Sequence, residues 1–287
     1  MPTFDELCAE LRKKTGDINL PAAIKILADL PDTEINKKDK FGETLLHLAA
    51  RKGHTQLLEL LLERKADDVI TNQQGHTPLH VAILENSEEA IRRLISAHAE
   101  IVETPDREGD AALEFAAKKG CTKAMSALFS PYAGNASTFF TYDNTHHVGE
   151  NNHLNKALIL AATFNRPDII SLLLDHGANI EYKSAGLTPL QHALKKSPKA
   201  VAFGAATELL ERGAMPEANE KSALAFLAER AYGEKVDGYA ELAELLIGRG
   251  AKVALALAIL KQDEGSFDKV QQVLFDLLST KSLSNTM

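Results

Sequence analysis

The sequence predicts an all-α solenoid built from stacked helix-turn-helix units. Three observations carry this prediction: an internal repeat of about 33 residues, a turn motif with glycine at the start of each unit, and an alanine- and leucine-rich composition without tryptophan. Aromatic residues make up 6% of the chain, which favours helices that pack through small and medium side chains over a β-sandwich.

The internal repeat is clearest near the N-terminus. Residues 39–62 read DKFGETLLHLAARKGHTQLLELLL, and residues 72–95 read NQQGHTPLHVAILENSEEAIRRLI. Matching glycines, threonines, leucines and histidines of the two copies are 33 residues apart. A third copy, DREGDAALEFAAKKGCTKAMSALF at residues 106–129, follows after a one-residue slip. Self-similarity at a fixed period indicates a repeat architecture.

The chemistry of each copy fits a turn followed by two helices. Asp or Asn and then Gly supply turn residues that tolerate positive φ. Thr44 and Thr77 stand where a helix N-cap is needed, and Pro78 stands at the first helical position. The second helix of each copy is leucine-rich on its inner side, for example at residues 57–62. One copy cannot bury that surface alone, so we expect the copies to stack.

These motifs resemble the ankyrin-repeat family, whose unit begins its first helix with T-P-L-H-x-A. Residues 74–82 (QGHTPLHVA) carry nearly the whole signature. The resemblance implies an ankyrin-repeat solenoid in which His47 and His80 hydrogen-bond turn backbone. It also implies that the module holds another protein and is not an enzyme.

Extending the register divides the chain into six segments. We expect an N-terminal helical cap, repeats 1–3, an insert loop, the degenerate and expanded repeats 4–6, a C-terminal helical cap and a flexible tail, at residues 1–38, 39–129, 130–150, 151–252, 253–279 and 280–287. Small expansions around residues 197–204 and 232–238 fall between the paired helices of a unit.

The insert is polar and carries several aromatic residues. In one interpretation it folds back over the core where the stack is interrupted. In a second, Phe139, Phe140 and Tyr142 are exposed anchors for a ligand. A hinge between two sub-stacks is the third interpretation.

Charge and cysteine content limit the classes of protein that fit. The formal net charge of −8 argues against nucleic acid as the main partner. Cys8 and Cys121 are too few for a disulfide framework, which favours a reducing compartment. The first residues lack the apolar core of a signal peptide, and no apolar run approaches the ~18 residues of a membrane span. We therefore expect a cytoplasmic monomer without membrane contact.

Candidate chemistry is scarce among the ten histidines and two cysteines. His146, His147 and His153 could bind a metal ion adventitiously, and we do not interpret them as a metal site. Cys121 replaces the usual histidine after Gly120, at a turn position that we expect near the surface, and we interpret it as an unreactive thiol. No glycine-rich phosphate loop is present. We predict no catalytic residue, metal site or cofactor.

A partner-binding surface follows from the resemblance, because turn tips and inner faces of first helices line a groove in an ankyrin stack. The predicted contact residues are Lys40, Phe41, Glu43, Arg51, Lys52, Gln74, His76, Arg107, Lys118, Lys119, Phe164 and Leu187, with Phe139, Phe140 and Tyr142 from the insert. Basic pairs end three of the first helices, at residues 51–52, 118–119 and 195–196. They predict a positive stripe, although cations at a helix C-terminus also complement the helix dipole.

The leading functional hypothesis is an adaptor or scaffold that binds a partner protein or peptide on its concave face. The partner would be acidic and would carry one or two hydrophobic anchors. The alternative is the recognition arm of a host-targeted bacterial effector, with an activity in the insert or the C-terminal third, acting in the host cytoplasm. Nucleic-acid binding through the basic pairs is a third, weaker hypothesis.

Overall fold

The computed structural model describes residues 3–13, 18–130, 153–196, 203–217, 222–229, 238–261 and 269–284. These residues form helices and turns, with one isolated antiparallel bridge between Ser184 and Leu187. The chain divides into two compact units, Met1–Gly149 and Glu150–Met287, which we call the first unit and the second unit. Each is described by itself.

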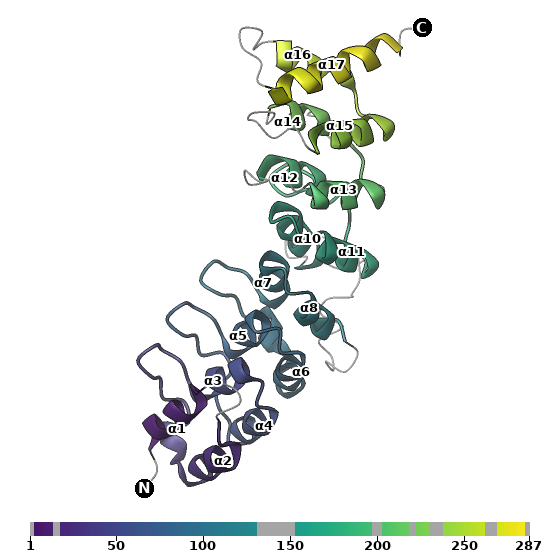
Figure 1. Cartoon of the computed structure of the whole chain (residues 1–287). Coiled ribbons are helices and arrows are strands. Elements are labelled where there is room, and N and C mark those ends of the chain that lie inside the picture. Colours follow the sequence, from purple (N-terminus) through teal and green to yellow (C-terminus); the bar gives the residue numbers. More distant parts are fainter. Residues whose placement is uncertain are drawn as a thin grey trace. The chain divides into compact units, whose positions relative to one another are not determined.

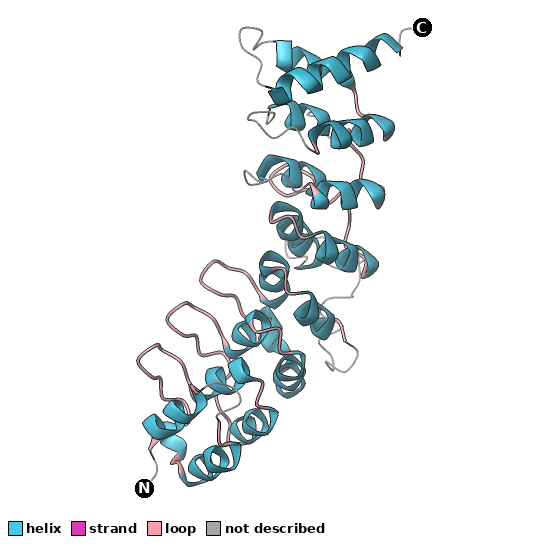
Figure 2. Ribbon diagram, viewed as in Figure 1, coloured by secondary structure: helices cyan, strands magenta, loops and turns pink. Residues whose placement is uncertain are grey.

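The first unit consists of helix pairs. Its elements are α1 (Phe4–Leu11), α2 (Leu20–Asp29), the 3-10 helix η1 (Asp32–Glu34), α3 (Leu45–Lys52), α4 (Thr55–Glu63), α5 (Pro78–Leu84), α6 (Glu88–Ala97), the 3-10 helix η2 (Ala99–Glu103), α7 (Ala112–Lys119) and α8 (Thr122–Leu128). The first helices α1, α3, α5 and α7 lie in one row, and α2, α4, α6 and α8 lie in a second (Figure 1). Long loops project beside the first row (Figure 2). We call the pairs α3–α4, α5–α6 and α7–α8 repeats 1, 2 and 3.

The second unit has the same two-row plan. Its helices are α10 (His153–Thr163), α11 (Pro167–Asp175), α12 (Pro189–Lys196), α13 (Gly204–Glu211), α14 (Ala223–Glu229), α15 (Tyr239–Gly248), α16 (Val253–Lys261) and α17 (Lys269–Ser284). Helices α10, α12, α14 and α16 pack in sequence against one another, as do α11, α13, α15 and α17.

The helix ends follow from the sequence motifs. Thr44 and Thr77 are the N-caps of α3 and α5, and Pro78 is the first residue of α5, as predicted. Gly53 and Gly120 end α3 and α7 in the left-handed conformation, where a side chain would be strained. Two-helix repeats with short connections therefore result from local signals in each copy.

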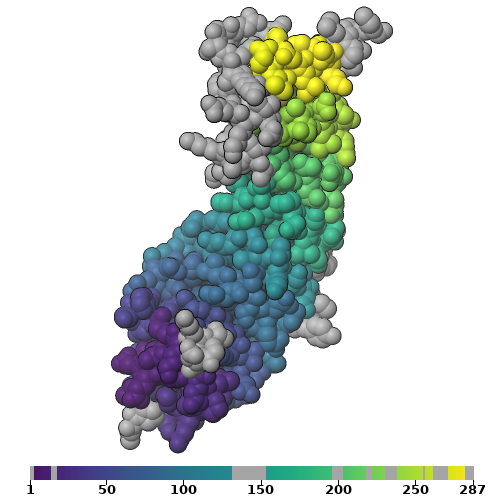
Figure 3. Space-filling view, in the orientation of Figure 1, coloured from purple at the N-terminus to yellow at the C-terminus, as the bar shows by residue number. Residues whose placement is uncertain are grey.

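The core lies between neighbouring repeats. In α4, Leu57, Leu58 and Leu61 are at most 1% exposed, and Ala49 and Ala50 of α3 are fully buried. The small alanine side chains let first helices pack closely, and the leucines fill the space between second helices. In the space-filling view, successive repeats of the first unit follow one another in chain order (Figure 3).

The C-terminal boundary differs from the prediction. Residues 280–284 were expected in a flexible tail, yet they belong to α17. The hydroxyl of Thr280 donates to the backbone oxygens of Asp276 and Leu277, so its polar side chain is accommodated within a helix. Most of the predicted insert, and most of the expansions in repeats 5 and 6, lie outside the described residues.

Candidate partner-binding surface

Three turns project beside the first helices of the first unit. We call residues 39–43, 72–76 and 106–110 tips 1, 2 and 3. The first residue of each tip, namely Asp39, Asn72 or Asp106, accepts the backbone N–H groups of the residues two and four positions later, at 2.8–3.1 Å. One side chain therefore fixes each turn, which explains why Asp or Asn is needed there.

Neighbouring tips also contact each other. The backbone N–H of Gln73 donates to the oxygen of Phe41 at 3.3 Å, and its side-chain amide donates to the oxygen of Lys40 at 2.8 Å. Gly75 has a φ of +82°, and a Cβ atom there would lie 2.1 Å from Cγ of Arg107. Only glycine permits this approach, so the tips of the first unit form a packed row.

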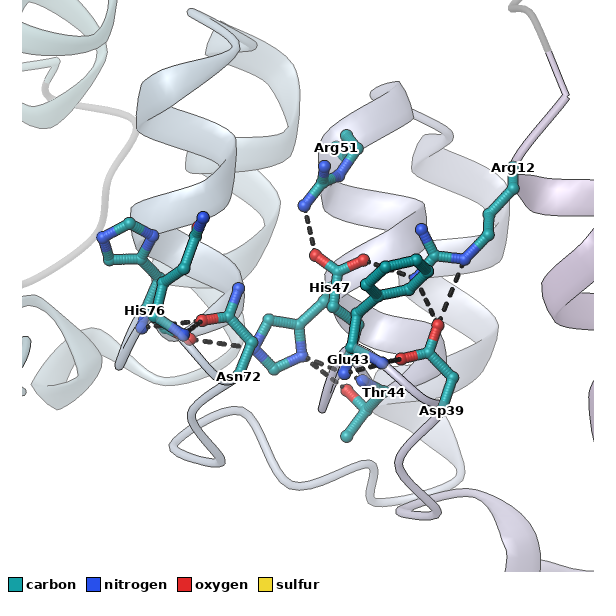
Figure 4. A network of polar contacts seen from close by, with 10 residues as sticks. Arg12, Asp39, Glu43, Thr44, His47, Arg51, Asn72 and His76 are labelled. Atoms are coloured by element: carbon teal, nitrogen blue, oxygen red, sulfur yellow. Dashed lines mark hydrogen bonds and ion pairs between the residues drawn. The ribbon is translucent and has the colours of Figure 1, made fainter.

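His47 joins repeat 1 to tip 2, as the family resemblance implied. Its Nδ1 accepts the backbone N–H of Thr44 at 3.2 Å, so Nε2 carries the proton and donates to the backbone oxygen of His76 at 3.0 Å (Figure 4). His80 repeats this arrangement, with Nε2 donating to the oxygen of Asp110 at 3.2 Å. Burial lowers the pKa of each ring to about 4, which keeps both histidines neutral. Their role is structural.

An ionic cluster sits at the base of tip 1 (Figure 4). Arg12, which follows α1, pairs with Asp39 and with Glu43, and Arg51 pairs with Glu43 from the other side. Burial alone would raise the pKa of Asp39, but hydrogen bonds from Arg12 and from the backbone N–H groups of Glu43 and Phe41 outweigh it and lower that pKa.

Glu43 therefore does not occupy the position predicted for it. The sequence register placed it on the solvent-facing tip, yet it is 3% exposed beneath two arginines. Its carboxylate neutralises part of the charge of Arg12 and Arg51 within the protein. This side chain has almost no surface to offer a partner.

A second ion pair lies at tip 3. The ammonium of Lys118 donates to Asp110 at 2.5 Å and to Glu108 at 2.6 Å. Burial would lower the pKa of Lys118, but these hydrogen bonds raise it, so the side chain stays charged. Arg51 and Lys118 are thus compensated internally, and the predicted positive stripe is narrower than the sequence suggested.

Four of the predicted cations form no ion pair with any described residue: Lys40, Lys52, Arg107 and Lys119. Lys40, Arg107 and Lys119 are exposed, and Lys52 is half-buried. The ammonium of Lys119 lies 5.2 Å from the ring centre of Phe115, and that of Lys40 lies 5.2 Å from the ring centre of Phe41. These contacts orient the cations without neutralising them.

Two large apolar side chains of the first unit are exposed near these cations. Phe41 on tip 1 is 46% exposed, and the guanidinium of Arg12 lies 4.5 Å from its ring centre. Leu84, the last residue of α5, is 39% exposed. Leu84 stands where repeats 1 and 3 carry Arg51 and Lys118, so alignment of the repeats places it in the last turn of its first helix, on the same row as those cations.

The remaining predicted contact residues are divided between the two units of the chain. Gln74 is exposed and His76 is half-buried, both on tip 2. Phe164, 40% exposed, and Leu187, half-buried, belong to the second unit and to its own surface. Phe139, Phe140 and Tyr142 lie outside the described residues.

Other candidate chemistry has little support in the described part of the chain. No group of three or more His, Cys, Asp or Glu side chains there could hold a metal ion. Cys121, expected near the surface, is buried because α8, which it precedes, packs against α6 and α7. His146 and His147 lie outside the described residues.

Comparison with known families gives a match over most of the chain. The sequence-family model described as ankyrin repeats (three copies) matches residues 16–105, 70–138 and 137–220 of this chain. Human neurogenic locus notch homolog protein 1 is 32% identical over 145 residues, which is 50% of this chain and 5% of that protein. The mouse nuclear factor NF-kappa-B p105 subunit is 35% identical over 86 residues, which is 29% of this chain and 9% of that protein. The chain thus matches only a small part of each relative's length.

Solved structures of ankyrin repeat domains have a similar fold. The ankyrin repeat domain of Bcl-3 has a TM-score of 0.60 at 23% identity, covering 84% of this chain and 100% of that one. An ankyrin repeat domain from Acinetobacter baumannii AYE has a TM-score of 0.53 at 26% identity, covering 72% and 98%.

Ankyrin repeats are generally protein–protein interaction modules, and their fold is a non-catalytic scaffold. Within the described residues, no helix is both long and apolar enough to cross a membrane. The repeat motifs, the two-row stack and the family match together show that this chain belongs to the ankyrin-repeat family.

Proposed function

We propose that this chain is an adaptor that holds an acidic protein segment on the basic face of its first unit. The basic face comprises tips 1–3 and the last turns of α3, α5 and α7, and corresponds to the concave side in the family resemblance. The observation that carries the proposal is a set of four cations, Lys40, Lys52, Arg107 and Lys119, that form no ion pair with any described residue, in a chain of net charge −8.

The local excess of positive charge supports an acidic partner. Of the five carboxylates on this face, those of Asp39, Glu43, Glu108 and Asp110 pair with cations of this chain, whereas that of Asp106 pairs with no cation among the described residues. Six cations against five carboxylates leave a formal excess of one positive charge on the face. A negatively charged segment would therefore meet cations that no internal acid compensates, and electrostatic attraction would speed its association.

The exposed apolar groups supply the second part of the interface. Phe41 and Leu84 expose large apolar surface that folding does not bury. Apolar side chains surrounded by polar groups are typical anchor positions in protein interfaces. An acidic segment with one or two hydrophobic residues matches both features. Cys8 and Cys121 are buried thiols, which supports action in a reducing compartment such as the cytoplasm.

A charge-matched pair of variants tests this proposal. The face variant K40Q/R107Q/K119Q and the control K25Q/K65Q/K123Q each remove three exposed cations, the control set lying outside the basic face. Both would be compared with the wild type in affinity capture from cell lysate, with mass spectrometry of the retained proteins. We expect the face variant to lose the acidic proteins that the wild type and the control retain. Equal retention by all three proteins would contradict the proposal.

Phe41 needs its own control because its ring also stacks against Arg12. Phe41→Ala would remove an anchor and also release the guanidinium that pairs with Asp39 and Glu43. Arg12→Gln releases the same ion pairs and leaves the phenyl ring in place. If Phe41 is an anchor, Phe41→Ala weakens capture more than Arg12→Gln does. If both variants lose the same amount of captured protein, the loss comes from the disrupted ion pairs of tip 1 and Phe41 is not an anchor.

A further inference from the structure

Repeats 1 and 3 share an ion pair that repeat 2 lacks. In repeat 1, Glu43 at the end of tip 1 pairs with Arg51, eight residues later in the last turn of α3. In repeat 3, Asp110 at the end of tip 3 pairs with Lys118, eight residues later in the last turn of α7. Each pair crosses from the tip to the end of the first helix, on the basic face.

His76 and Leu84 occupy the same two positions in repeat 2, again eight residues apart. Leu84 is 39% exposed. The ring of His76 lies with its centre 5.0 Å from that of Phe115 and 6.1 Å from that of His80. Its Nδ1 is buried and has no hydrogen-bond partner among the described residues. Repeat 2 thus carries His76 and Leu84, which we call the patch, at the two positions whose side chains form an ion pair in repeats 1 and 3.

The charges next to this patch alternate along the face. The residue after Arg51 is Lys52, the residue after Leu84 is Glu85, and the residue after Lys118 is Lys119. Lys52 and Lys119 carry no ion pair with described residues, so repeats 1 and 3 present cations on either side of the patch. Glu85 would repel an acidic group placed directly over repeat 2.

From this arrangement we propose that repeat 2 is the anchor position of the basic face. The patch of His76 and Leu84 receives one aliphatic or aromatic side chain of an acidic segment, whose flanking carboxylates pair with Lys52 and Lys119. The inference rests on the proposed function and specifies the partner as acidic on both sides of a central apolar residue.

The partly buried position of His76 favours an apolar side chain of the partner as the group that covers the patch. Desolvation lowers the pKa of His76, and the nearby cations Lys119 and Arg51 lower it further, against the opposing carboxylates of Asp106 and Glu108. A neutral imidazole packed against the buried ring of Phe115 is a group that an apolar side chain can cover without leaving a charge desolvated.

A charge-neutral swap tests the anchor. The variant H76E/L84R gives repeat 2 the ion pair of repeats 1 and 3 without changing net charge. The probes are short synthetic peptides with Asp and Glu flanking a central Leu, matched peptides with a central Ala, and matched peptides with Asn and Gln in place of the acids. Binding to the full-length chain would be followed by fluorescence anisotropy, with circular dichroism to check folding.

For the wild type we expect the central-Leu peptide to bind about tenfold more tightly than the central-Ala peptide, the effect of burying one aliphatic side chain. For H76E/L84R we expect the two peptides to bind equally, at the weaker affinity. Leu84→Ala is the milder variant if the swap fails to fold, and it should reduce the preference several-fold. A central-Leu preference that persists in a folded variant would overturn the anchor assignment.

The face variant used to test the proposed function also distinguishes a failure of the anchor assignment from a failure of the proposed function. K40Q/R107Q/K119Q should weaken both acidic peptides while leaving the preference for central Leu. If acidic peptides bind and central Leu gives no advantage, the anchor assignment fails and the proposed function stands. If no acidic peptide binds, or if a single-stranded oligonucleotide of equal charge binds more tightly, both proposals fail.

Discussion

The two units share one architecture but use different polar groups to join their repeats. In the first unit, His47 and His80 each donate from a first helix to the tip of the next repeat. In the second unit, Gln191 of α12 stands at the corresponding position, where its Oε1 accepts the backbone N–H of Thr188 at 3.1 Å. An amide thus replaces an imidazole as the group that caps the first helix.

Carboxylates and an arginine join neighbouring repeats of the second unit at their connectors. Glu181 accepts the N–H of Met215 at 2.7 Å, and Glu217 accepts the N–H of Lys252 at 2.9 Å. Arg249 donates to the backbone oxygen of Leu210, as Arg64 of the first unit does to the backbone oxygens of Leu27 and Leu30, so this contact is common to both units. Apolar stacking therefore defines the fold in both units, whereas the polar groups between repeats can vary and give each unit its own response to pH and mutation.

The largest expected effect is acid destabilisation of the first unit. Burial lowers the pKa of His47 and of His80 from 6.5 to about 4. The unfolded chain therefore binds more protons than the folded chain between these values, so stability is full above about pH 6.5 and falls as pH drops to about 4. Each histidine would account for about 3 kcal/mol.

Hydrogen exchange with mass spectrometry can follow the two units of the full-length chain separately. At each pH, after correction for intrinsic exchange, protection should fall in the peptides of repeats 1–3 before it falls in α10–α17. The variant H47Q/H80Q should flatten this dependence. Equal losses of protection in both units, or an unchanged profile in the variant, would remove the histidines as the cause.

His80→Ala should have the next largest effect. It leaves the oxygen of Asp110 and the cap of α5 without their partner and opens a cavity, at a cost of about 3 kcal/mol in the free energy of unfolding. His80→Gln copies Gln191 and keeps one donor and one acceptor, so it should cost about 1 kcal/mol. Denaturant unfolding measures both. Equal costs would mean that the hydrogen bonds contribute little.

Arg249→Ala should act on the second unit alone. The substitution removes the donor to the oxygen of Leu210 at the end of α13, with an expected cost of about 1–2 kcal/mol. Hydrogen exchange should report lower protection in α13 and α15, with repeats 1–3 unchanged. Arg166→Ala, on a half-buried arginine of the same unit, is a control for loss of an arginine. Comparable losses in the two variants would contradict a specific role for Arg249.

The smallest effect is a gain from Val69→Asn. In the connector before repeat 1, Asn36 accepts the N–H of Asp67 at 2.9 Å, and Val69 stands one period later without a side-chain acceptor. Val69 is 50% exposed, so replacing it removes little buried surface. We expect about 0.5 kcal/mol of added stability from a new hydrogen bond, measured by thermal unfolding. Val69→Ala controls for loss of the valine, and it should not match the gain.

Local motifs made much of the fold predictable. The caps Thr44 and Thr77 and the backbone-bonding roles of His47 and His80 are confirmed. These caps and hydrogen bonds all involve residues that are close in sequence or one repeat apart, so the repeat pattern of the sequence is enough to predict them. The extent of α17 was not predicted correctly, because a polar segment such as residues 280–284 gives no periodic apolar signal.

The candidate surface was less predictable because its charges are balanced by side chains from other elements. Glu43 is buried by Arg12, which comes from the segment after α1, and by Arg51 at the far end of α3. No property of tip 1 alone shows that these arginines reach the same carboxylate. The exposed position of Leu84 becomes informative only when the ion pairs of repeats 1 and 3 are seen.

The family, the two-helix repeat, the turn residues and the structural histidines could all be read from the sequence. These features follow from period, capping and turn chemistry, which act over a few residues or one repeat. The contacts between repeats were needed to show which cations form no ion pair with a described residue and which apolar groups stay exposed. Those properties depend on distances between side chains of different repeats, because an ion pair forms wherever folding brings two charges together and the register alone does not give those distances.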